Sequence, residues 1–496
     1  MKTVAQLFDG ILERDLWAAH AQREITGVFD DSRQVMPGSA FVSLKGVALD
    51  GRRFIDDARQ HGASLVIGED LAPQPGLVTL SVPDARAALG RLAARWYELD
   101  SASRTEFKLL GVTGTNGKST TTHMVREIMR AAGKRCGMLG TVQYDLCCRS
   151  VVADMTTPGP LTLAGYLREC AAAGAHAAVM EVSSHALDQK RTEGLRFAGA
   201  AFTNLTRDHL DYHQTLESYA DAKARLFDGL DSDSQAIVNA DDPAHTRMIR
   251  DCKARVLTFS IRGPADITAQ LTRDSIGGTL YRMRINGRDL VLENALVGKH
   301  NVYNALTAAG LALAAGLTPD EISAGLALVR NIPGRLQRVP CMRGVDVFVD
   351  YAHTDDALRN VLSVLRPLTR GRLIVVFGCG GDRDRSKRPL MARAAAEYAH
   401  AIIVTSDNPR TEDPNAIIAE IMNGFDESSR RRVIVEPDRR AAIFAALAGT
   451  SPGDVVLLAG KGHEDYQIIG RHKVHFDDVE VALQSAAKVE SIKVVA

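Results

Sequence analysis

The chain has 496 residues, with 60 Lys and Arg against 60 Asp and Glu, and 45% of its residues are hydrophobic. At about 100–200 residues per domain, this length predicts roughly three domains, each large enough to bury its own core. The ordinary composition argues against a disordered, collagenous or coiled-coil protein. The formal net charge of zero argues against a general nucleic-acid binder, because contacts to many phosphates need a surplus of basic residues.

The cysteines and the N-terminus indicate a compartment. Seven cysteines, an odd number without a CxxC pair, do not make a disulfide framework, so we expect reduced thiols and a cytoplasmic protein. The first 17 residues carry acids among the apolar residues and lack the hydrophobic run of a signal peptide. Because no stretch approaches about 18 uninterrupted apolar residues, we expect no membrane span.

Residues 1–100 are predicted to form a small α/β domain. Apolar runs at 40–44, 64–67 and 77–82 predict strands, and 85–99 predicts a helix that closes the unit. The polar segment 100–106 is typical of a linker.

Residues 101–332 are predicted to form a central domain around a parallel sheet. An apolar run at 108–112 leads through a glycine turn to a helix over 119–132, and strand-like runs follow at 177–182, 198–204 and 236–239. Strands that alternate with helices are typical of βαβ units. Between 266 and 293, Gly277-Gly278 and Asn286-Gly287 predict hairpin turns. Two helices are expected between 301 and 329.

The segment Asn331-Ile-Pro-Gly-Arg335 separates this unit from a third, at 333–496. Strand-like runs lie at 345–350, 372–377, 401–405, 433–435 and 454–459, with helical segments between them. That pattern predicts a Rossmann-like domain. The expected fold class is therefore α/β, with three domains.

The most specific motif is Gly111-Val-Thr-Gly-Thr-Asn-Gly-Lys-Ser-Thr120, between a predicted strand and a predicted helix. Glycines let backbone N–H groups approach phosphate oxygens, and the helix N-terminus adds a favourable dipole. In such a loop Lys118 would reach the β- and γ-phosphates and Ser119 would contact Mg²⁺. The strict pattern requires a glycine at the position of Val112, so a coincidental glycine turn remains an alternative.

Acidic and histidine residues follow later strands of the same predicted sheet. Glu181 ends one buried run and is a candidate metal ligand, and Asp208 and His209 follow the run at 198–204. The carboxyl ends of strands form the ligand crevice in open α/β sheets. Each of these side chains alone is equally compatible with a structural role.

Several motifs together resemble those of the Mur ligase family. They are Gly-Thr-Asn-Gly-Lys-Ser at 114–119, Glu-Val-Ser-Ser-His at 181–185, Thr-Asn-Leu-Thr-Arg-Asp-His-Leu-Asp-Tyr-His at 203–213 and Gly298-Lys-His-Asn-Val-Tyr-Asn304. Enzymes of this family use ATP to join an amino acid to a carboxylate during bacterial cell-wall precursor synthesis. The resemblance covers all three predicted domains.

The two outer domains resemble the family member that adds the third amino acid. At the N-terminus, Asp31-Ser-Arg33 and Asp50-Gly-Arg-Arg-Phe54 are similar to its uridine-nucleotide domain. The C-terminal motifs that match it are Asp350-Tyr-Ala-His353, Gly380-Gly-Asp-Arg-Asp384, Asp407-Asn-Pro-Arg410 and Gly460-Lys-Gly-His-Glu464. One departure is Asp355, where the family commonly has proline; Thr354 followed by acids is still expected to begin a helix.

The resemblance implies roles for individual residues. ATP would be bound by Gly114, Thr115, Asn116, Gly117, Lys118, Ser119, Thr120, Asn301, Arg335 and Asp350. The substrate UDP-N-acetylmuramoyl-L-alanyl-D-glutamate would be bound by Ser32, Thr156, Thr157, Ser183, Gln189 and Arg191. Catalytic roles would fall to Lys118, Glu181, His209 and Lys223, and Mg²⁺ would be held by Ser119, Glu181 and Lys223 as a carbamate. An unmodified Lys223 would more plausibly be a solvated helix residue.

The resemblance also implies that the added amino acid is meso-diaminopimelate. It assigns this ligand to Arg383, Asp407, Asn408, Pro409, Arg410, Gly460 and Glu464. Arg410 can hold the distal carboxylate through two parallel hydrogen bonds, Arg383 the other carboxylate, and Asp407 and Glu464 can receive an ammonium. Lysine would leave a buried arginine unpaired. Taken alone, Asn-Pro is also ordinary turn chemistry.

The implied activity is an ATP-dependent amide ligase that works through an acyl phosphate, with the protein expected to be a monomer. Two alternatives remain open. A related ligase would add lysine here, or glutamate to a folate, with the same ATP machinery. A phosphate-loop ATPase or switch would hydrolyse ATP without making a covalent product.

Overall fold

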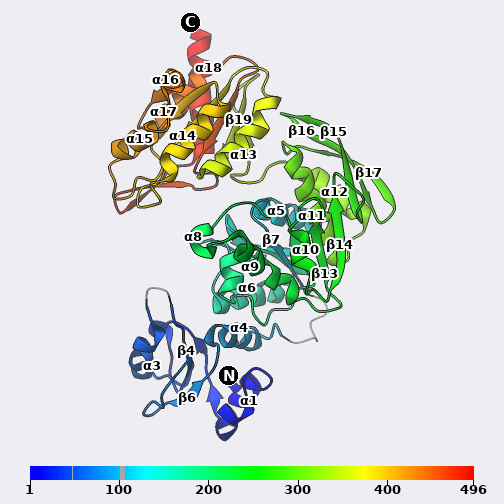
Figure 1. The fold of residues 1–496 in the computed structure, drawn as a ribbon, viewed down its shortest axis with the longest axis vertical. Helices are drawn as coiled ribbons and strands as arrows, with labels where there is room; N and C mark the ends of the chain where they lie inside the picture. The colour runs from blue at the N-terminus through cyan, green and yellow to red at the C-terminus, as the bar shows by residue number, and fades with distance from the viewer. Residues whose placement is uncertain (47–48, 101–106, 496) are drawn as a thin grey trace. The chain divides into compact units, whose positions relative to one another are not determined.

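The computed structural model describes residues 1–46, 49–100 and 107–495 (Figure 1). Apart from Asp100, the predicted linker at 100–106 lies outside the described residues. The chain divides into two compact units, and each is described by itself. The first comprises Met1–Ala269, Met283–Leu290 and Tyr303–Leu326, and the second comprises Gln270–Arg282, Val291–Val302 and Ala327–Ala496.

The N-terminal part is a small α/β fold, as predicted. Its parallel sheet has the order β3 (Val28–Phe29), β4 (Ala40–Ser43), β5 (Leu65–Gly68), β6 (Val78–Ser81). Helix α4 (Ala85–Trp96) begins at Asp84, whose side chain accepts a 2.8 Å hydrogen bond from Ala87 N. Leu89 and Leu92 of α4 are buried in one cluster with Val42 and Leu65 of the sheet. Burial of this apolar helix face is what closes the unit.

The central sheet is built around parallel strands whose residues are mostly buried and mostly apolar, as expected for strands covered on both faces. In spatial order the parallel strands are β8 (Cys136–Leu139), β11 (Ala177–Glu181), β7 (Lys108–Thr113), β12 (Gly199–Phe202), β13 (Gln235–Asn239) and β14 (Arg255–Ser260). In the register, Glu181 lies beside Val112 on β7, and Phe202 of β12 lies beside Thr113. The carboxyl ends of β11, β7 and β12 therefore meet at one edge of the sheet.

Further elements complete this sheet. Strands β15 (Ile267–Ser275), β16 (Gly278–Ile285) and β17 (Arg288–Asn294) are neighbours joined at the two predicted turns, which confirms the hairpins. Strands β9 (Gln143–Asp145) and β10 (Ser150–Val152) form an antiparallel edge that the sequence did not predict. The helices are α5 (Lys118–Ala131), α6 (Pro160–Ala172), α7 (Ser184–Asp188), α8 (Leu210–His213), α9 (Leu216–Asp228), α10 (His245–Ile249), α11 (Lys299–Ala314) and α12 (Pro319–Leu328).

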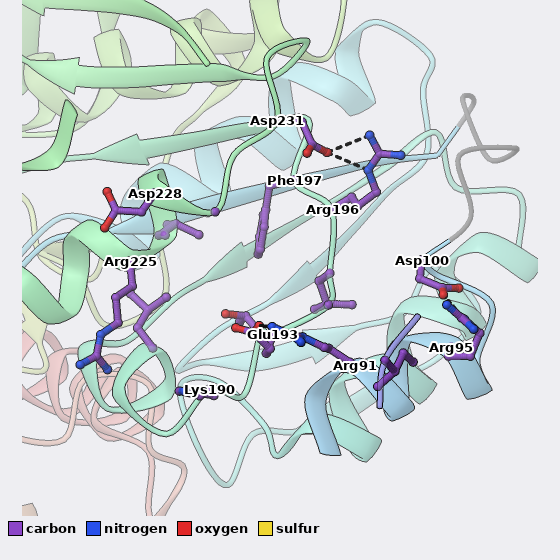
Figure 2. Close-up of a pocket in the computed structure, with 17 residues that line it drawn as sticks. Arg91, Arg95, Asp100, Lys190, Glu193, Arg196, Phe197, Arg225, Asp228 and Asp231 are labelled. Carbon is purple, nitrogen blue, oxygen red and sulfur yellow. Dashed lines mark hydrogen bonds and ion pairs between the residues drawn. The ribbon is translucent and has the colours of Figure 1, made fainter. Parts of the chain in front are cut away.

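A cavity of about 630 Å³ opens next to residues that precede β12 and β13 (Figure 2). Its charged lining is largely neutralised by ion pairs, such as Arg196–Asp231 at 2.8 Å and Arg91–Glu193 at 2.7 Å. Because residues before parallel strands lie at the amino edge of a sheet, this cavity is at the opposite edge from the glycine loop that follows β7. It is therefore separate from the candidate site below.

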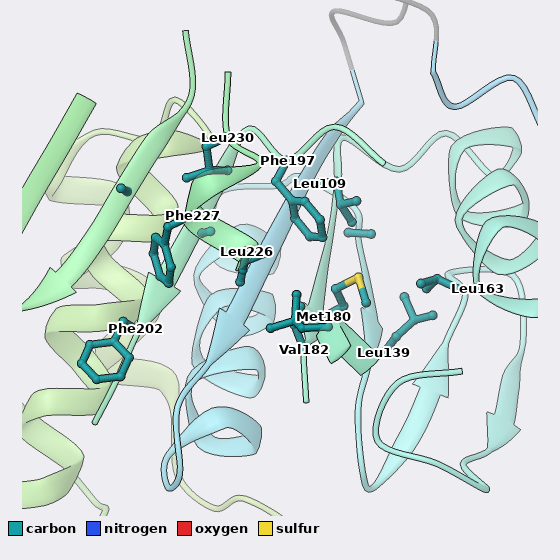
Figure 3. Packing of buried hydrophobic residues seen from close by; sticks show 14 of the residues in the cluster. Leu109, Leu139, Leu163, Met180, Val182, Phe197, Phe202, Leu226, Phe227 and Leu230 are labelled. Carbon is teal, nitrogen blue, oxygen red and sulfur yellow. The ribbon is translucent and has the colours of Figure 1, made fainter. Parts of the chain in front are cut away.

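One apolar cluster fixes the strands that carry that site. It brings Leu139, Met180 and Phe202 from three strands together with Leu226 and Phe227 of α9 (Figure 3). Each of these side chains is at most 4% exposed. Since a fully buried large side chain contributes about 1.5–3 kcal/mol, this packing holds α9 firmly against the sheet.

The C-terminal part contains the predicted Rossmann-like sheet, with every predicted strand confirmed. Its order is β18 (Gln337–Val339), β19 (Asp346–Asp350), β23 (Val455–Ala459), β20 (Leu373–Phe377), β21 (Ala401–Val404) and β22 (Val433–Val435). All are parallel except β18, an edge strand that was not predicted. A short hairpin of β24 (Tyr466–Ile469) and β25 (His472–His475) was also not predicted.

Helices cover both faces of this sheet. Helices α13 (Asp355–Leu365), α14 (Lys387–Tyr398) and α15 (Pro414–Met422) share one apolar cluster, and α17 (Arg439–Ala448) and α18 (Asp478–Val495) share another. Neighbouring strand residues point to opposite clusters, as Val375 and Val376 do. Thr354 caps α13 by accepting a hydrogen bond from Ala357 N at 3.2 Å, so the predicted helix start holds without the family's proline. Among the described residues, no helix is long and apolar enough to cross a bilayer.

Candidate active site

The glycine loop between β7 and α5 has the backbone that a phosphate-binding loop requires. Gly114 has a φ of 140° and Gly117 a φ of 92°, which other residues rarely adopt. A Cβ at Gly114 would lie 1.9 Å from Thr203 Oγ1, and one at Gly117 would lie 2.3 Å from Asn304 Oδ1. Val112 is a buried strand residue of β7, so a glycine there is unnecessary and the loop begins at Gly114.

The loop is held by its own lysine and by the segment after β12. Lys118 Nζ donates to Gly114 O at 2.9 Å and to Thr115 O at 2.8 Å. Asn116 N donates to Asn204 Oδ1 at 3.0 Å. Ser119 and Thr120, in the first turn of α5, are buried. The loop is thus rigid before any ligand is present, which favours anion binding by backbone N–H groups.

Glu181 is a buried carboxylate at the end of the strand next to the loop. Its Oε1 accepts a hydrogen bond from Thr141 N at 2.8 Å, and its Oε2 accepts one from Thr141 Oγ1 at 3.1 Å. The side chain is 1% exposed, and a Cβ at Gly140 would lie 2.2 Å from Oε1. Each oxygen retains a further lone pair, and Thr141 is a partner that the sequence did not indicate.

Lys223 lies beneath the phosphate loop rather than in solvent. Its side chain is 1% exposed, Nζ donates to Gly114 O at 3.0 Å, and Nζ lies 4.2 Å from the centre of the Tyr219 ring. Burial, together with the nearby charge of Lys118, holds the pKa of Lys223 well below its usual range. The interpretation of Lys223 as a solvated helix residue is therefore wrong.

His209 belongs to a group of rings that borders the loop. Its ring centre lies 4.9 Å from that of His185 and 6.2 Å from that of Tyr219, which itself approaches Thr115 Oγ1 at 3.3 Å. Burial is the main reason that the pKa of His209 is lowered; the nearby carboxylate of Asp208 opposes this shift, and the charge of Lys118 adds to it. The ring is therefore neutral over most of the physiological pH range.

The residues expected to hold the UDP substrate are mostly brought together around Glu181. Thr157 Oγ1 donates to Glu181 O at 2.8 Å and accepts from Ser183 N at 3.1 Å. Arg191 donates to Thr157 O at 2.7 Å and to Gln189 Oε1 at 2.8 Å. Thr156 Oγ1 lies 3.1 Å from Thr141 Oγ1. Ser32 lies elsewhere, buried at the start of the 3-10 helix η2 (Ser32–Gln34) in the N-terminal part.

The remaining predicted ATP residues belong to the second unit. Asn301, near the start of α11, donates from Nδ2 to Val297 O at 2.8 Å, in the segment just before the helix. Asp350 ends β19 and accepts hydrogen bonds from Leu336 N at 2.6 Å and Ala352 N at 2.9 Å. Burial raises the pKa of Asp350, while Arg335 opposes this shift.

The residues expected to bind the amino acid converge at the carboxyl edge of the C-terminal sheet. They stand on the loops that follow β20, β21 and β23. Asn408 joins two of these loops, because its Nδ2 donates to Glu464 Oε2 at 2.9 Å and its Oδ1 accepts from Ile468 N at 2.9 Å. Asp407 and Asn408 are buried beneath the site.

Two carboxylates share one buried ammonium at this edge. Lys461 is 0% exposed, and its Nζ lies 3.7 Å from Asp407 Oδ1 and 3.4 Å from Glu464 Oε2. Within the described part of the chain, Asp407 Oδ1 has no hydrogen-bond partner. Burial raises the pKa of Glu464, and the charge of Asp407 raises it further. The two carboxylates carry one more negative charge than Lys461 can neutralise. Lys461 lies within the Gly460–Glu464 motif, but the sequence did not predict its burial.

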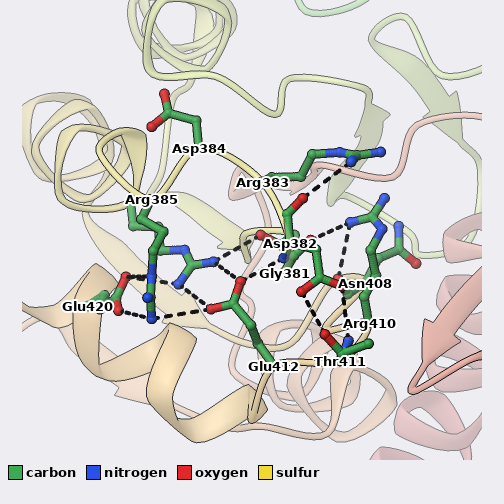
Figure 4. Close-up of polar contacts among 12 residues, drawn as sticks. Gly381, Asp382, Arg383, Asp384, Arg385, Asn408, Arg410, Thr411, Glu412 and Glu420 are labelled. Atoms are coloured by element: carbon green, nitrogen blue, oxygen red, sulfur yellow. Dashed lines mark hydrogen bonds and ion pairs between the residues drawn. The ribbon is translucent and has the colours of Figure 1, made fainter. Parts of the chain in front are cut away.

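Two arginines flank the same edge. Arg410, with a φ of 52°, donates from Nη1 to Gly381 O at 2.9 Å, and Arg383 donates to Asp382 O at 3.2 Å (Figure 4). A Cβ on Gly380 would lie 2.8 Å from Arg410 Nη1 and 3.8 Å from Arg383 Cγ. Pro409 lies between the acidic and basic residues of the second loop. The edge therefore offers two guanidinium groups beside two carboxylates.

Comparison with known proteins identifies the family. Residues 24–97 match a model described as Mur ligase family, catalytic domain; residues 112–312 match the Mur ligase middle domain, and residues 334–462 match the Mur ligase, glutamate ligase domain. A curated relative from Geobacter sulfurreducens, named UDP-N-acetylmuramoyl-L-alanyl-D-glutamate--2,6-diaminopimelate ligase, is 44% identical over 490 residues, covering 95% of this chain and 96% of the relative. The chain belongs to the Mur ligase family.

Solved Mur ligase structures have the same architecture. A structure of a UDP-N-acetylmuramoyl-L-alanyl-D-glutamate--2,6-diaminopimelate ligase matches with a TM-score of 0.72 at 35% identity, covering 99% of this chain and 100% of that chain. A MurF ligase from Thermotoga maritima, solved in complex with ADP, matches with a TM-score of 0.59 at 19% identity, covering 94% and 98%. At that identity the second likeness shows the fold alone. The predicted three-domain α/β architecture is thus confirmed as that of a Mur ligase.

Proposed function

We propose that this Mur ligase uses ATP to join meso-diaminopimelate to UDP-N-acetylmuramoyl-L-alanyl-D-glutamate in peptidoglycan precursor synthesis. The observation that carries the proposal is that the loops at one edge of the C-terminal sheet bear two arginines, Arg383 and Arg410, and two carboxylates, Asp407 and Glu464. Meso-diaminopimelate bears two carboxylates and two amino groups, so its charges complement that edge. The name of the curated relative at 44% identity agrees with this choice.

We expect the distal end of the amino acid, where diaminopimelate and lysine differ, to determine which of them is bound. Arg410 would hold the distal carboxylate in a bidentate pair, and Asp407 and Glu464 would receive the distal ammonium, with Asn408, Pro409 and Gly460 shaping the loops around it. Arg383 would contact the carboxylate beside the reacting amine. Lysine lacks the distal carboxylate and would leave a guanidinium unmatched, which rejects an analogue by about 10⁴–10⁵-fold in favourable cases.

ATP would bind at the glycine loop. The backbone N–H groups of residues 114–120 and the start of α5 would hold the phosphates, and Lys118 would neutralise the charge that develops on the transferred phosphoryl group. Asn301, Arg335 and Asp350 are proposed to contact the nucleotide as well. Ser32, Thr156, Thr157, Ser183, Gln189 and Arg191 would hold the UDP-linked substrate.

The donor set at the loop suits Mg²⁺. Ser119 and Glu181 offer hard oxygen ligands, and Mg²⁺ typically takes only one or two carboxylates together with phosphate oxygens and water. When bound, the ion would supply charge neutralisation for phosphoryl transfer.

Lys223 would contribute as a carbamate. Its lowered pKa supports this, because only the neutral amine can add to carbon dioxide, with loss of one proton. The product carries a carboxylate-like oxygen pair beside the loop, where it would serve as a further Mg²⁺ ligand.

The reaction would proceed in two displacements. The γ-carboxylate of the substrate's D-glutamate attacks the γ-phosphorus of ATP, forming an acyl phosphate and releasing ADP. The neutral amine of diaminopimelate then attacks the acyl carbon, phosphate leaves, and the amine proton is lost to give the amide. His209, whose lowered pKa keeps its ring neutral, lies near the loop and is proposed to act beside the transferring group.

We also propose that the protein acts in the cytoplasm as a monomer. All seven cysteines are free thiols, which suits a reducing compartment.

Release of phosphate tests the proposed reaction. With ATP, phosphate should appear only when both the UDP-linked dipeptide and diaminopimelate are present, because the acyl phosphate needs both partners to turn over. Each substrate omitted in turn is the control. Steady release from ATP alone would instead favour an ATPase or switch and contradict the ligase.

A further inference from the structure

A fully buried arginine, Arg388, contacts one of the loops of the amino-acid edge, which is the carboxyl edge of the C-terminal sheet that bears Arg383, Asp407, Arg410 and Glu464. Arg388 is the second residue of α14, and its side chain is 0% exposed. A cation at a helix N-terminus opposes the helix dipole, and burying a guanidinium costs free energy. Buried ion pairs are weak evidence for stability, because apolar residues of similar size often replace them without loss. The position therefore calls for another explanation.

Arg388 is bound to two carboxylates that follow β21 in sequence. Its Nη1 and Nη2 donate to Glu412 Oε2 and Oε1 at 3.0 and 2.9 Å, a bidentate pair, and Nη1 also donates to Glu420 Oε2 at 2.8 Å. Nη2 further donates to Gly380 O at 3.3 Å, in the loop after β20. The bond from Arg388 is the main reason that the pKa of Glu412 falls to about 2, so this carboxylate stays ionised throughout the physiological range.

Glu412 extends the connection to the loop that carries Arg383. Its Oε1 accepts from Asp382 N at 2.6 Å, and the Asp382 carboxylate in turn accepts from Thr411 Oγ1 at 2.7 Å and from Thr411 N at 3.2 Å (Figure 4). Together with Gly381 N, which donates to Asn408 O at 2.9 Å, these bonds tie the two loops to each other along their length.

The tied backbone is strained on both sides. Asp382 has a φ of 53° and Arg410 a φ of 52°, left-handed conformations that cost free energy outside glycine. The loops also approach closely, because a Cβ on Gly381 would lie 1.9 Å from Pro409 O. Such a conformation persists only where surrounding contacts over-determine it. Arg410 is itself one of these strained positions, and Arg383 directly follows the other.

We propose that Arg388 is a positioning residue for amino-acid selection: through Glu412 it fixes the loop after β20 to the loop after β21 and so sets the spacing of Arg383 and Arg410. This rests on the proposed function, in which those two arginines hold the two carboxylates of one amino acid. The ligand class it selects is an amino acid with a second carboxylate at a fixed distance from the first. A bidentate clamp loses its advantage when its donors move by about 1 Å, since that displacement costs about 100-fold in rate.

Arg388→Gln tests the proposal, and the chain offers a matched control. Arg385 contacts the same two carboxylates, at 2.7 Å to Glu420 and 3.4 Å to Glu412, but its side chain is 62% exposed. We expect Arg388→Gln to raise the KM for diaminopimelate about 10- to 100-fold and to leave the KM values for ATP and the UDP-linked dipeptide unchanged. Arg385→Gln should leave all three KM values near those of the unmodified protein.

Selectivity separates positioning from a merely structural role. A loss of folded protein would lower kcat alike for every substrate and leave KM unchanged, whereas a displaced clamp should reduce the preference for diaminopimelate over lysine. Thr411→Val changes an exposed residue and removes one hydrogen bond between the two loops, from Thr411 Oγ1 to Asp382. It should raise the KM for diaminopimelate and weaken the preference over lysine by a smaller factor, about 3- to 10-fold. This variant tests the proposal if Arg388→Gln fails to fold.

An unchanged KM for diaminopimelate and an unchanged preference over lysine in the folded variants would overturn the proposal. The unmodified protein is measured in the same experiment. If it forms no product with diaminopimelate, the proposed function fails; if it forms product and the variants match it, only the role of Arg388 fails.

Discussion

The glycine loop and the amino-acid edge both sit at the carboxyl ends of parallel strands, yet they are built differently. The loop works through backbone geometry encoded in a short continuous motif, and its lysine is held by the loop's own carbonyls. The amino-acid edge carries side-chain charges from three separate loops, which are held by two buried cations: Lys461 lies beside Asp407 and Glu464, and Arg388 is paired with Glu412. A site made of backbone can be recognised from a motif, whereas a site made of opposed charges depends on tertiary packing.

The largest effect is expected at the loop. Lys118→Met should lower kcat about 10²–10³-fold, because it removes a fixed charge that stabilises the transferring phosphoryl group. Lys134→Met, just beyond the other end of α5, is the control and should be neutral. Phosphate release with all substrates present measures both. A Lys118→Met enzyme of normal kcat would show that the backbone alone is sufficient.

The corresponding change at the edge is Arg410→Lys. A point charge cannot reproduce a bidentate fork, and breaking a buried pair costs about 3–5 kcal/mol, so kcat/KM for diaminopimelate should fall about 10²–10³-fold. The KM for ATP should hardly change, since Arg410 is not among the residues proposed to contact the nucleotide. Steady-state kinetics with each substrate varied decide this. A rate with diaminopimelate equal to that of the unmodified protein would refute the clamp.

A smaller effect concerns pH. Only ionised Glu464 can receive an ammonium, and its pKa is raised by burial and by Asp407. Binding should therefore weaken as pH falls, beginning above the usual glutamate range, and the KM for diaminopimelate should rise by about 10-fold per unit below that pKa. Glu464→Gln should abolish this acid limb, and Lys461→Met should move it to higher pH. If the KM for diaminopimelate in the unmodified protein does not change as the pH falls, Glu464 does not bind the ammonium.

Much of the fold could be predicted because its strands are short, buried apolar runs between turn signals. Strands such as β20 and β23 are buried throughout, and hydrophobic runs of that kind are the strongest sequence signal. The strands that were missed carry little such signal. β25 is exposed along its whole length, and β10 has no buried residue.

The sequence predicted those site residues that lie in a recognisable motif or directly after a predicted strand. Lys223 shows the limit, because its burial under Gly114 follows from how α9 packs and not from its neighbours in sequence. The burial of Lys461 and Arg388 also depends on tertiary packing, because their carboxylate partners lie on separate loops. Charged side chains are almost never fully buried unless paired, so sequence patterns place them at the surface until their partners on distant loops are known.

The identity of the added amino acid tests the central claim most directly. The protein is given ATP, the UDP-linked dipeptide, and equal concentrations of diaminopimelate and lysine, and the products are weighed by mass spectrometry. A product carrying only diaminopimelate is expected, because Arg383 and Arg410 are proposed to bind one carboxylate each. A lysine adduct in comparable yield would contradict the assignment of the amino-acid edge.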